Sequence, residues 1–289
     1  MSVSPPSVSP NIVLRGQTLP AFFYGTAWKE DRTERCVSAA LQAGFRAIDT
    51  ANQRKHYFEA GVGAALQAAY ASQGLTREDL FLQTKFTFLA GQDQRLPYDP
   101  EADLTTQVSQ SFASSLSHLG TDYLDSYVLH GPSTGGQGLT SADWEVWRAM
   151  EALQKSGQVK LLGVSNINVW QLQALLEGAT VAPAIVQNRC YARSQWDAAV
   201  RAICARNDMR YQGFSLLTAN VRELNHPLMQ SLAVKYGVGW MQLVFRFALQ
   251  LGMLPLTSTT DPGHMAQDLA VFQFELSQEE VELIETIAQ

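Results

Sequence analysis

The chain has 289 residues, of which 46% are hydrophobic and 17% are charged, and its formal net charge at pH 7 is −6. This length suits one large domain, and (β/α)8 barrels of about 250 residues fold as single units. A mildly acidic chain without a Lys/Arg cluster offers no electrostatic footprint for nucleic acid or an anionic membrane, so neither partner is expected.

The cysteine pattern and the N-terminal segment both indicate a cytoplasmic protein. Cys36, Cys190 and Cys204 are scattered, and their odd number cannot complete a disulfide framework. Residues 1–10 are rich in Ser and Pro and lack the basic and apolar blocks of a signal peptide. We therefore predict a disordered tail at residues 1–10 and one domain at residues 11–289.

The secondary-structure signals alternate along the chain. Residues 11–20 read as a hairpin turning at Arg15-Gly16, and the first strand follows at residues 21–25. Helices are predicted at residues 32–43, 59–70, 101–119, 142–155, 169–176, 195–205, 227–235 and 240–251. Seven more strands are predicted at residues 47–48, 80–84, 126–129, 161–164, 184–186, 210–214 and 253–256.

Eight strands separated by helices imply parallel crossovers, so the predicted fold is α/β, a closed (β/α)8 TIM barrel with an N-terminal β-hairpin. Residues 240–251 have no strand before them and should form the crossover helix to the last strand, with residues 227–235 preceding it. An extra C-terminal helix at residues 277–288, opened by a Ser277/Glu280 capping box, should pack outside the barrel.

Polar or aromatic residues stand at the ends of six successive predicted strands. Taken singly, each has a plain structural explanation such as helix capping or solvation. Together they favour a functional site, because the loops after barrel strands meet on one face. These strand-end residues are Asp49, Lys85, His130, Ser165 with Asn166, Gln187, and Phe214 with Ser215.

This set suits proton transfer coupled to attack at a carbonyl carbon. A tyrosine hydroxyl has a reference pKa near 10 and is a poor acid at neutral pH unless a cation stabilises the phenolate. Lys85 could supply that cation, Asp49 could hold Lys85 charged and oriented, and His130 could hydrogen-bond the substrate oxygen.

Several short motifs, in order and spacing, resemble those of the aldo-keto reductases. They are Gly25-Thr26, Ile48-Asp49-Thr50-Ala51, Thr84-Lys85, Leu129-His130-x-Pro132, Gly163-Val164-Ser165-Asn166, Gln187 and Phe274-Glu275-Leu276-Ser277. The resemblance covers residues 11–289. It implies a barrel that binds an extended nicotinamide dinucleotide without a Rossmann domain and reduces an aldehyde or ketone by hydride transfer.

The resemblance places the family's catalytic Asp, Lys and His on Asp49, Lys85 and His130. The family's catalytic Tyr usually follows the Asp by five residues, where this chain has Arg54. Counting back from the helix that starts at Glu59 indicates a two-residue insertion and points to Tyr57 as the general acid. Arg54 and His56 remain the alternatives for that position.

For the cofactor, the resemblance implies amide contacts from Ser165, Asn166 and Gln187 and ring stacking on Phe214. Ser215 and Leu217 fall where the pyrophosphate is usually met, and Thr26 belongs to the first strand turn. The adenosine end is expected at Ser258, Thr259, Thr260, His264, Gln267 and Asp268.

This adenosine end departs from the family pattern. Leu256 stands where a Lys is common and His264 where an Arg is common, so two permanent cations suited to the 2′-phosphate are absent. Both NADP(H) and NAD(H) therefore stay open as cofactors. A redox-neutral barrel enzyme and a nicotinamide-sensing regulatory protein are the alternative functions.

The remaining expectations concern the pocket, metals and assembly. Trp28, Phe86, Phe88 and Trp170 lie near strand ends and are candidates to line a small-molecule pocket. No metal site is expected, because the histidines lack HxxxH or HxH spacing. Gly61-Val62-Gly63 falls inside a helical pattern, which argues against a phosphate-binding loop. We expect a monomer.

Overall fold

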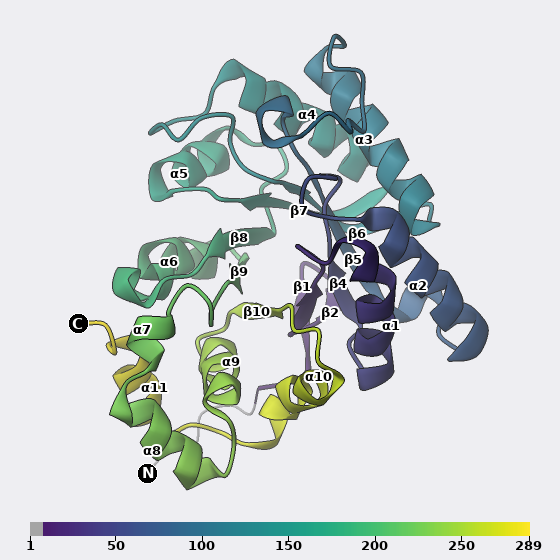
Figure 1. Cartoon of the computed structure of the whole chain (residues 1–289). Helices are drawn as coiled ribbons and strands as arrows, with labels where there is room; N and C mark the ends of the chain where they lie inside the picture. The colour runs from purple at the N-terminus through teal and green to yellow at the C-terminus, as the bar shows by residue number, and fades with distance from the viewer. Residues whose placement is uncertain (1–7) are drawn as a thin grey trace.

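The computed structural model describes residues 8–289 and arranges them around one closed parallel barrel (Figure 1). The strand order is β10-β3-β4-β5-β6-β7-β8-β9. The strands are β3 (Phe23–Gly25), β4 (Ala47–Asp49), β5 (Phe81–Phe86), β6 (Leu124–Leu129), β7 (Val159–Ser165), β8 (Ile185–Arg189), β9 (Arg210–Phe214) and β10 (Leu254–Thr257). The predicted (β/α)8 barrel is confirmed.

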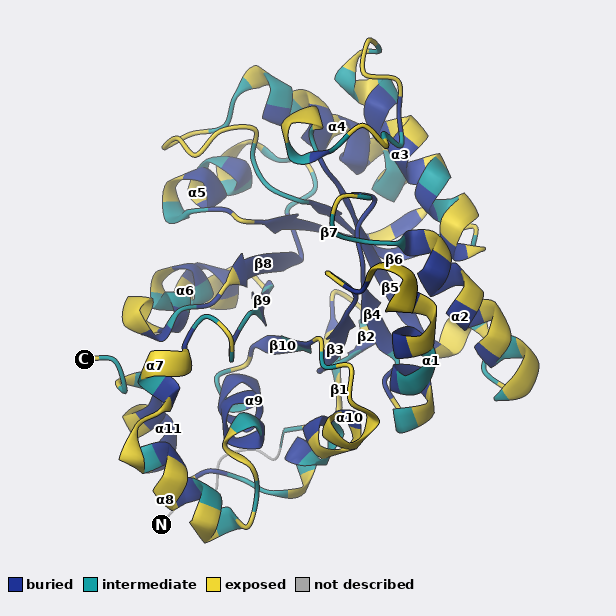
Figure 2. Ribbon diagram, viewed as in Figure 1, coloured by how far each residue is buried: buried dark blue, intermediate teal, exposed yellow. Residues whose placement is uncertain are grey.

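Helices follow the strands and surround the barrel. They are α1 (Thr33–Ala43), α2 (Glu59–Ser72), α3 (Leu104–Leu119), α4 (Ser141–Lys155), α5 (Val169–Gly178), α6 (Ala198–Arg206), α7 (Val221–Leu224), α8 (Pro227–Tyr236), α9 (Trp240–Gln250), α10 (Pro262–Leu269) and α11 (Gln278–Glu285). Their buried faces turn towards the strands and their exposed faces outwards (Figure 2). As predicted, α8 and α9 lie between β9 and β10.

Short 3-10 helices and the hairpin complete the fold. The 3-10 helices are η1 (Glu30–Arg32), η2 (Arg77–Asp79), η3 (Leu89–Gly91), η4 (Ala192–Asp197) and η5 (Ala270–Gln273). The predicted hairpin is present as β1 (Asn11–Leu14) and β2 (Gln17–Pro20), with Arg15 and Gly16 at positive φ. The Arg15 guanidinium donates to the carbonyls of Ala182 and Pro183, just before β8, so the hairpin lies at the N-terminal end of the barrel.

Of the tail predicted at residues 1–10, residues 1–7 lie outside the described residues. Across residues 8–289 we find no helix with the length and hydropathy needed to span a membrane. The same residues hold no group of three or more His, Cys, Asp and Glu side chains placed to bind a metal ion.

The C-terminal helix α11 begins as predicted, with a Ser277/Glu280 capping box. The helix predicted at residues 195–205 is wrong at its start, because Gln195, Trp196 and Asp197 have φ of 53°, 55° and 58° and α6 begins only at Ala198. Trp196 is fully buried and its Nε1 donates to the Ile284 carbonyl at 3.1 Å. Anchoring of this indole against α11 explains why the segment leaves the helical conformation.

Gly63 lies inside α2, in agreement with the helical interpretation of the Gly61-Val62-Gly63 stretch. A Cβ built on Gly63 would stand 1.9 Å from the His118 carbonyl oxygen, so glycine allows α2 to approach the α3 backbone closely. We expect Gly63→Ala to lower the free energy of unfolding by about 1–3 kcal/mol, as overpacking does. Urea denaturation measures the effect, and Gly138→Ala, with open space around it, is the control. Equal stability of the two variants would contradict this account.

Candidate active site

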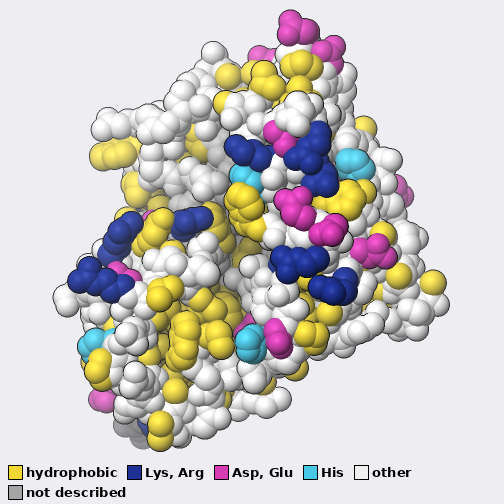
Figure 3. All heavy atoms as spheres, in the orientation of Figure 1, with side chains coloured by type: hydrophobic (Ala, Val, Ile, Leu, Met, Phe, Trp, Pro, Cys, Tyr) yellow, Lys and Arg dark blue, Asp and Glu magenta, His cyan; other side chains and the backbone are white. Residues whose placement is uncertain are grey.

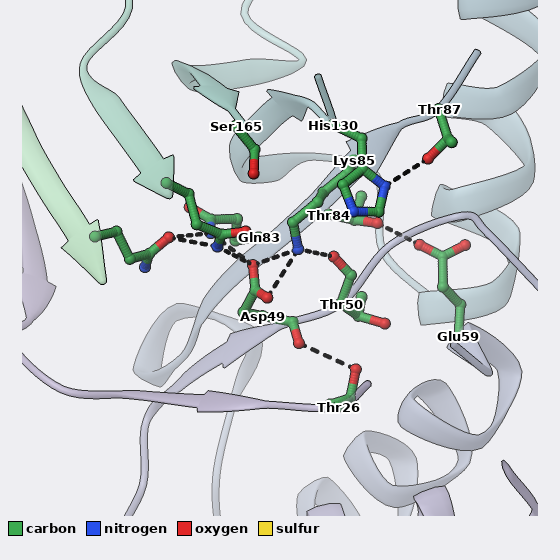
Figure 4. A network of polar contacts seen from close by, with 12 residues as sticks. Thr26, Asp49, Thr50, Glu59, Gln83, Thr84, Lys85, Thr87, His130 and Ser165 are labelled. Carbon is green, nitrogen blue, oxygen red and sulfur yellow. Dashed lines mark hydrogen bonds and ion pairs between the residues drawn. The ribbon is translucent and has the colours of Figure 1, made fainter. Parts of the chain in front are cut away.

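Four of the predicted strand-end residues lie close together where their strands end: Asp49, Lys85, His130 and Ser165 (Figure 4). Asp49 ends β4, Lys85 lies near the end of β5, His130 follows β6, Ser165 ends β7 and Gln187 lies on β8. The register of the parallel strands places residues of neighbouring strands side by side, for example Asp49 beside Gln83 and Ser165 beside Gln187. The structure therefore brings these predicted residues together on one face of the barrel.

Asp49 and Lys85 form a buried ion pair at the base of the site. Lys85 Nζ lies 2.7 Å from Asp49 Oδ1 and 2.8 Å from Oδ2, and it donates to the Thr50 carbonyl at 2.7 Å. These contacts use all three ammonium hydrogens. Burial lowers the pKa of Lys85, whereas the adjacent Asp49 carboxylate opposes that change and favours the ammonium.

Three buried glutamines, Gln83, Gln187 and Gln212, form a hydrogen-bond network with Asp49. Gln83 Nε2 and Gln187 Nε2 donate to Asp49 Oδ1 at 2.7 and 3.0 Å, and both donate to Gln212 Oε1 at 2.7 Å. Our sequence interpretation missed Gln83 and Gln212. Their spacing could have revealed them. Gln83 stands two residues before Lys85 and Gln212 two residues before Phe214, so each glutamine lies on the same face of its strand as that residue.

Tyr57 lies in the loop between β4 and α2, where it lines a cavity shared with Asp49 and His130. Lys85 Nζ is 5.2 Å from the centroid of the Tyr57 ring, and the Tyr57 and His130 rings are 5.9 Å apart at 70°. No hydrogen bond joins the Tyr57 hydroxyl to Lys85 within residues 8–289. Burial, followed by the Asp49 charge, raises the pKa of Tyr57, so its hydroxyl is protonated at neutral pH.

The two alternative residues for the acid position point elsewhere. The Arg54 guanidinium stacks over Phe58 at 4.4 Å and lies 3.5 Å from Glu30, in a cavity on the α3 side. The His56 ring lies 3.9 Å from the Trp28 ring and its Nδ1 is bonded to Gln53 at 3.0 Å. Both side chains are thus engaged outside the Asp49–Lys85 pair.

His130 is held as a neutral imidazole. Its Nδ1 lies 2.7 Å from Thr87 Oγ1, and its backbone N–H donates to the Phe86 carbonyl at 2.9 Å. Burial, together with the positive charge of Lys85, lowers the pKa of His130 to about 3. The ring is consequently uncharged at any pH near neutrality.

The cavity above these residues has a volume of about 550 Å³, within the usual range for small-molecule sites. It opens as a hollow at the centre of the face in Figure 3. Ten of the predicted cofactor residues line it: Ser165, Asn166, Gln187, Phe214, Ser215, Leu217, Ser258, Thr259, His264 and Asp268. The cavity thus connects the Asp49 region to the segment after β10.

Three predicted cofactor residues lie outside this lining. Thr26 is fully buried and its Oγ1 donates to the Asp49 carbonyl at 3.0 Å, so it supports the strand end. Thr260 and Gln267 are exposed. Asp268, by contrast, does line the cavity. It is buried and accepts a hydrogen bond from Thr257 Oγ1 at 2.7 Å, and burial raises its pKa to about 6.

A second, adjoining cavity contains part of the predicted aromatic lining. Trp28 and Phe88 line it together with His56, Thr87 and the start of the loop at Gly131. Phe86 instead belongs to the hydrophobic core, and Trp170 is exposed on α5. The predicted pocket aromatics therefore divide into two that line the cavity and two that do not.

Two cations near the cavity were not predicted from the sequence. Lys29 is buried, and its Nζ donates to the Ser258 carbonyl at 2.7 Å, while the Tyr24 hydroxyl donates to the Thr259 carbonyl at 2.8 Å. Arg189 lines the cavity, 5.7 Å from the centroid of the Phe214 ring. Its position two residues after Gln187 on one strand was the signal that could have revealed it.

Comparison with known proteins gives concordant results. The chain matches the Aldo/keto reductase family over residues 21–289. It is 31% identical to the uncharacterized oxidoreductase YtbE of Bacillus subtilis, over 94% of this chain and 90% of that protein. It is likewise 31% identical to methylglyoxal reductase DkgA of Salmonella typhimurium, over 92% and 88% of the two chains.

Solved structures agree. The Bombyx mori aldo-keto reductase AKR2E4 in complex with NADP has a TM-score of 0.82 at 27% identity, covering 96% of this chain and 92% of that one. An aldo-keto reductase from Brucella melitensis has a TM-score of 0.81 at 28% identity, covering 96% and 99%. Family match, relatives and fold lead to one conclusion: this chain belongs to the aldo/keto reductase family.

Proposed function

We propose that this protein reduces an aldehyde or ketone to an alcohol with NAD(P)H, and that Tyr57 is the general acid. The observation that carries the proposal is the grouping of a protonated phenol, a buried Asp49–Lys85 ion pair and a neutral His130 around one cavity. A related methylglyoxal reductase and a solved relative complexed with NADPH support the same reaction type.

The donor set of the cavity fits a nicotinamide dinucleotide. Ser165, Asn166 and Gln187 present hydroxyl and amide groups suited to a carboxamide, and Phe214 presents an aromatic face. Ser258 and Thr259 add hydroxyl groups at the far end. The reduced nicotinamide supplies the hydride when it is bound.

The protein's own residues then manage the proton and the developing negative charge. His130, as a neutral donor, orients the carbonyl oxygen, and Tyr57 gives its proton to that oxygen. Lys85 stabilises the resulting phenolate through its positive charge, and Asp49 keeps Lys85 protonated in its buried position.

The proposal is tested by titrating the purified protein with NADPH and with NADH while following Trp fluorescence, then assaying cofactor oxidation with small aldehydes including methylglyoxal. We expect saturable binding and carbonyl-dependent oxidation of at least one dinucleotide. Absence of binding at millimolar concentrations of both would overturn the proposal. Binding without turnover of any carbonyl would instead favour a nicotinamide-sensing protein.

Lys29 should make cofactor affinity pH-dependent. Burial lowers its pKa to about 8, so the ammonium that donates to the Ser258 carbonyl is lost as the pH rises through 8. Ser258 lines the cavity, and the protonated fraction of Lys29 falls about tenfold between pH 7 and 9, so we expect the Kd for NAD(P)H to increase about tenfold if only the charged form holds Ser258 in place. The Lys29→Met variant should bind NAD(P)H weakly already at pH 7, and its Kd should not increase further between pH 7 and 9. A step of equal size in Lys29→Met would refute the assignment to Lys29.

A further inference from the structure

Thr87 contacts Nδ1 of His130 through its side-chain hydroxyl. It follows β5 directly and is 5% exposed, and its Oγ1 lies 2.7 Å from His130 Nδ1 (Figure 4). The Thr87 backbone is itself fixed, because its carbonyl accepts hydrogen bonds from the Tyr98 hydroxyl at 2.8 Å and from Gln92 Nε2 at 3.4 Å. The hydroxyl is therefore presented to His130 from a rigid support.

A neutral imidazole carries one hydrogen, on either Nδ1 or Nε2. If Nδ1 held it, Nδ1–H would donate to Thr87 Oγ1, and the Thr87 hydroxyl hydrogen would need another acceptor. His130 is the only hydrogen-bond partner of Thr87 Oγ1 in the described part of the chain. No other atom of residues 8–289 would accept that hydrogen, and Thr87 is only 5% exposed, so this arrangement is the poorer one.

In the other arrangement Thr87 Oγ1–H donates to an unprotonated Nδ1, so the hydroxyl hydrogen has an acceptor and Nε2–H is left for a ligand. We propose that Thr87 is a positioning residue that fixes His130 in the tautomer with its hydrogen on Nε2. This inference rests on the proposed function, in which His130 donates to the carbonyl oxygen. With Nδ1 occupied by Thr87, Nε2–H is the group left to face the substrate, and His130 acts as a donor only.

The test compares Thr87→Val, which preserves shape but removes the hydroxyl, with Thr87→Ser, which keeps it. For Thr87→Val we expect about tenfold lower kcat/KM, carried mainly by kcat, with the Kd for NAD(P)H unchanged. The loss is smaller than the roughly 10²–10³-fold cost of deleting a donor to a developing oxyanion, because part of the population keeps the productive tautomer. Thr87→Ser should retain activity close to that of the unmodified protein.

Nitrogen-15 NMR of histidine-labelled protein gives a readout independent of activity. The His130 signals are assigned by their absence in His130→Gln among the five histidines of the chain. The unmodified protein and Thr87→Ser should show protonated Nε2 and unprotonated Nδ1, and Thr87→Val should show a mixture. Ser126 lies on the neighbouring strand β6, and its buried hydroxyl has no hydrogen-bond partner among residues 8–289, so Ser126→Ala should change neither readout.

The outcomes separate this inference from the proposed function. A protonated Nδ1 in the unmodified protein overturns the role of Thr87, whether or not Thr87→Val folds. Equal kcat/KM and equal spectra for Thr87→Val and Ser126→Ala overturn it as well. If the unmodified protein reduces no carbonyl but Thr87→Val still changes the tautomer of His130, the positioning role of Thr87 stands. Only the proposed function is then refuted.

Discussion

Replacing Tyr57 with phenylalanine should remove most carbonyl reduction while leaving the affinity for NAD(P)H unchanged. The substitution deletes one oxygen from a ring that stays packed beside Lys85 and His130. General acid catalysis contributes about 10²–10⁴-fold to rate, so we expect kcat to fall within that range. Steady-state assays measure the loss, and fluorescence titration of the cofactor measures the retained affinity.

Arg54→Met and His56→Gln are the matched controls in the same loop. Arg54 stacks on Phe58 and His56 on Trp28, so each substitution should alter packing and KM more than kcat. A loss of kcat in His56→Gln as large as that expected for Tyr57→Phe, with Tyr57→Phe active, would transfer the acid role to His56. The insertion before α2 would then have displaced Tyr57 from catalysis.

Lys85→Met should be the most destabilising substitution in the site. Lys85 is fully buried, and its removal leaves the Asp49 carboxylate among protein atoms without its cation. Removing one partner of a buried ion pair costs about 3–5 kcal/mol, and we expect that loss in the free energy of unfolding from urea denaturation. Carbonyl reduction should be lost together with the cation that stabilises the Tyr57 phenolate.

Two measurements check this cause. The double variant Asp49→Asn with Lys85→Met should be more stable than Lys85→Met alone, because the uncompensated charge is absent. In Lys85→Met the isolated carboxylate should have a raised pKa, so the destabilisation should shrink as the pH falls and the carboxylate becomes protonated. A pH-independent loss would show that lost packing, rather than buried charge, is responsible.

Most of the barrel was predictable because its strands are short apolar runs separated by amphipathic helices, and periodicity reports burial directly. The exceptions have local causes. Residues Gln195–Asp197 are not helical as predicted, because all three have positive φ angles. This conformation lets Trp196 pack against α11, and the sequence pattern cannot show a contact between such distant parts of the chain. The sequence analysis also missed α10, although Asp261 at the N-cap and Pro262 in the first turn are a recognised helix-start signal.

The site was predictable where a residue ends a strand and less so elsewhere. The grouping of Asp49, Lys85 and His130 on one face was predictable because the strand ends of a barrel share that face. Lys29 was missed, since its approach to Ser258 depends on the path of a loop with strained residues, Trp28 and Glu30, at positive φ. The distance of Tyr57 from Lys85 likewise depends on the loop conformation and follows from no sequence rule.

The three glutamines next to Asp49, which are Gln83, Gln187 and Gln212, restrict how an amide ligand can be oriented in the cavity. Gln187 donates both amide hydrogens, one to Asp49 and one to Gln212, so only its oxygen remains for a ligand in the cavity. Ser165 Oγ accepts from Asn166 Nδ2 at 3.1 Å, which leaves the Ser165 hydroxyl hydrogen as a donor. An amide bound between them is expected to turn its NH2 towards Gln187 and its oxygen towards Ser165. The polarity of this chain of amides in the barrel interior is thus expected to select one of the two orientations of a bound carboxamide, which differ by a half-turn about its bond to the ring.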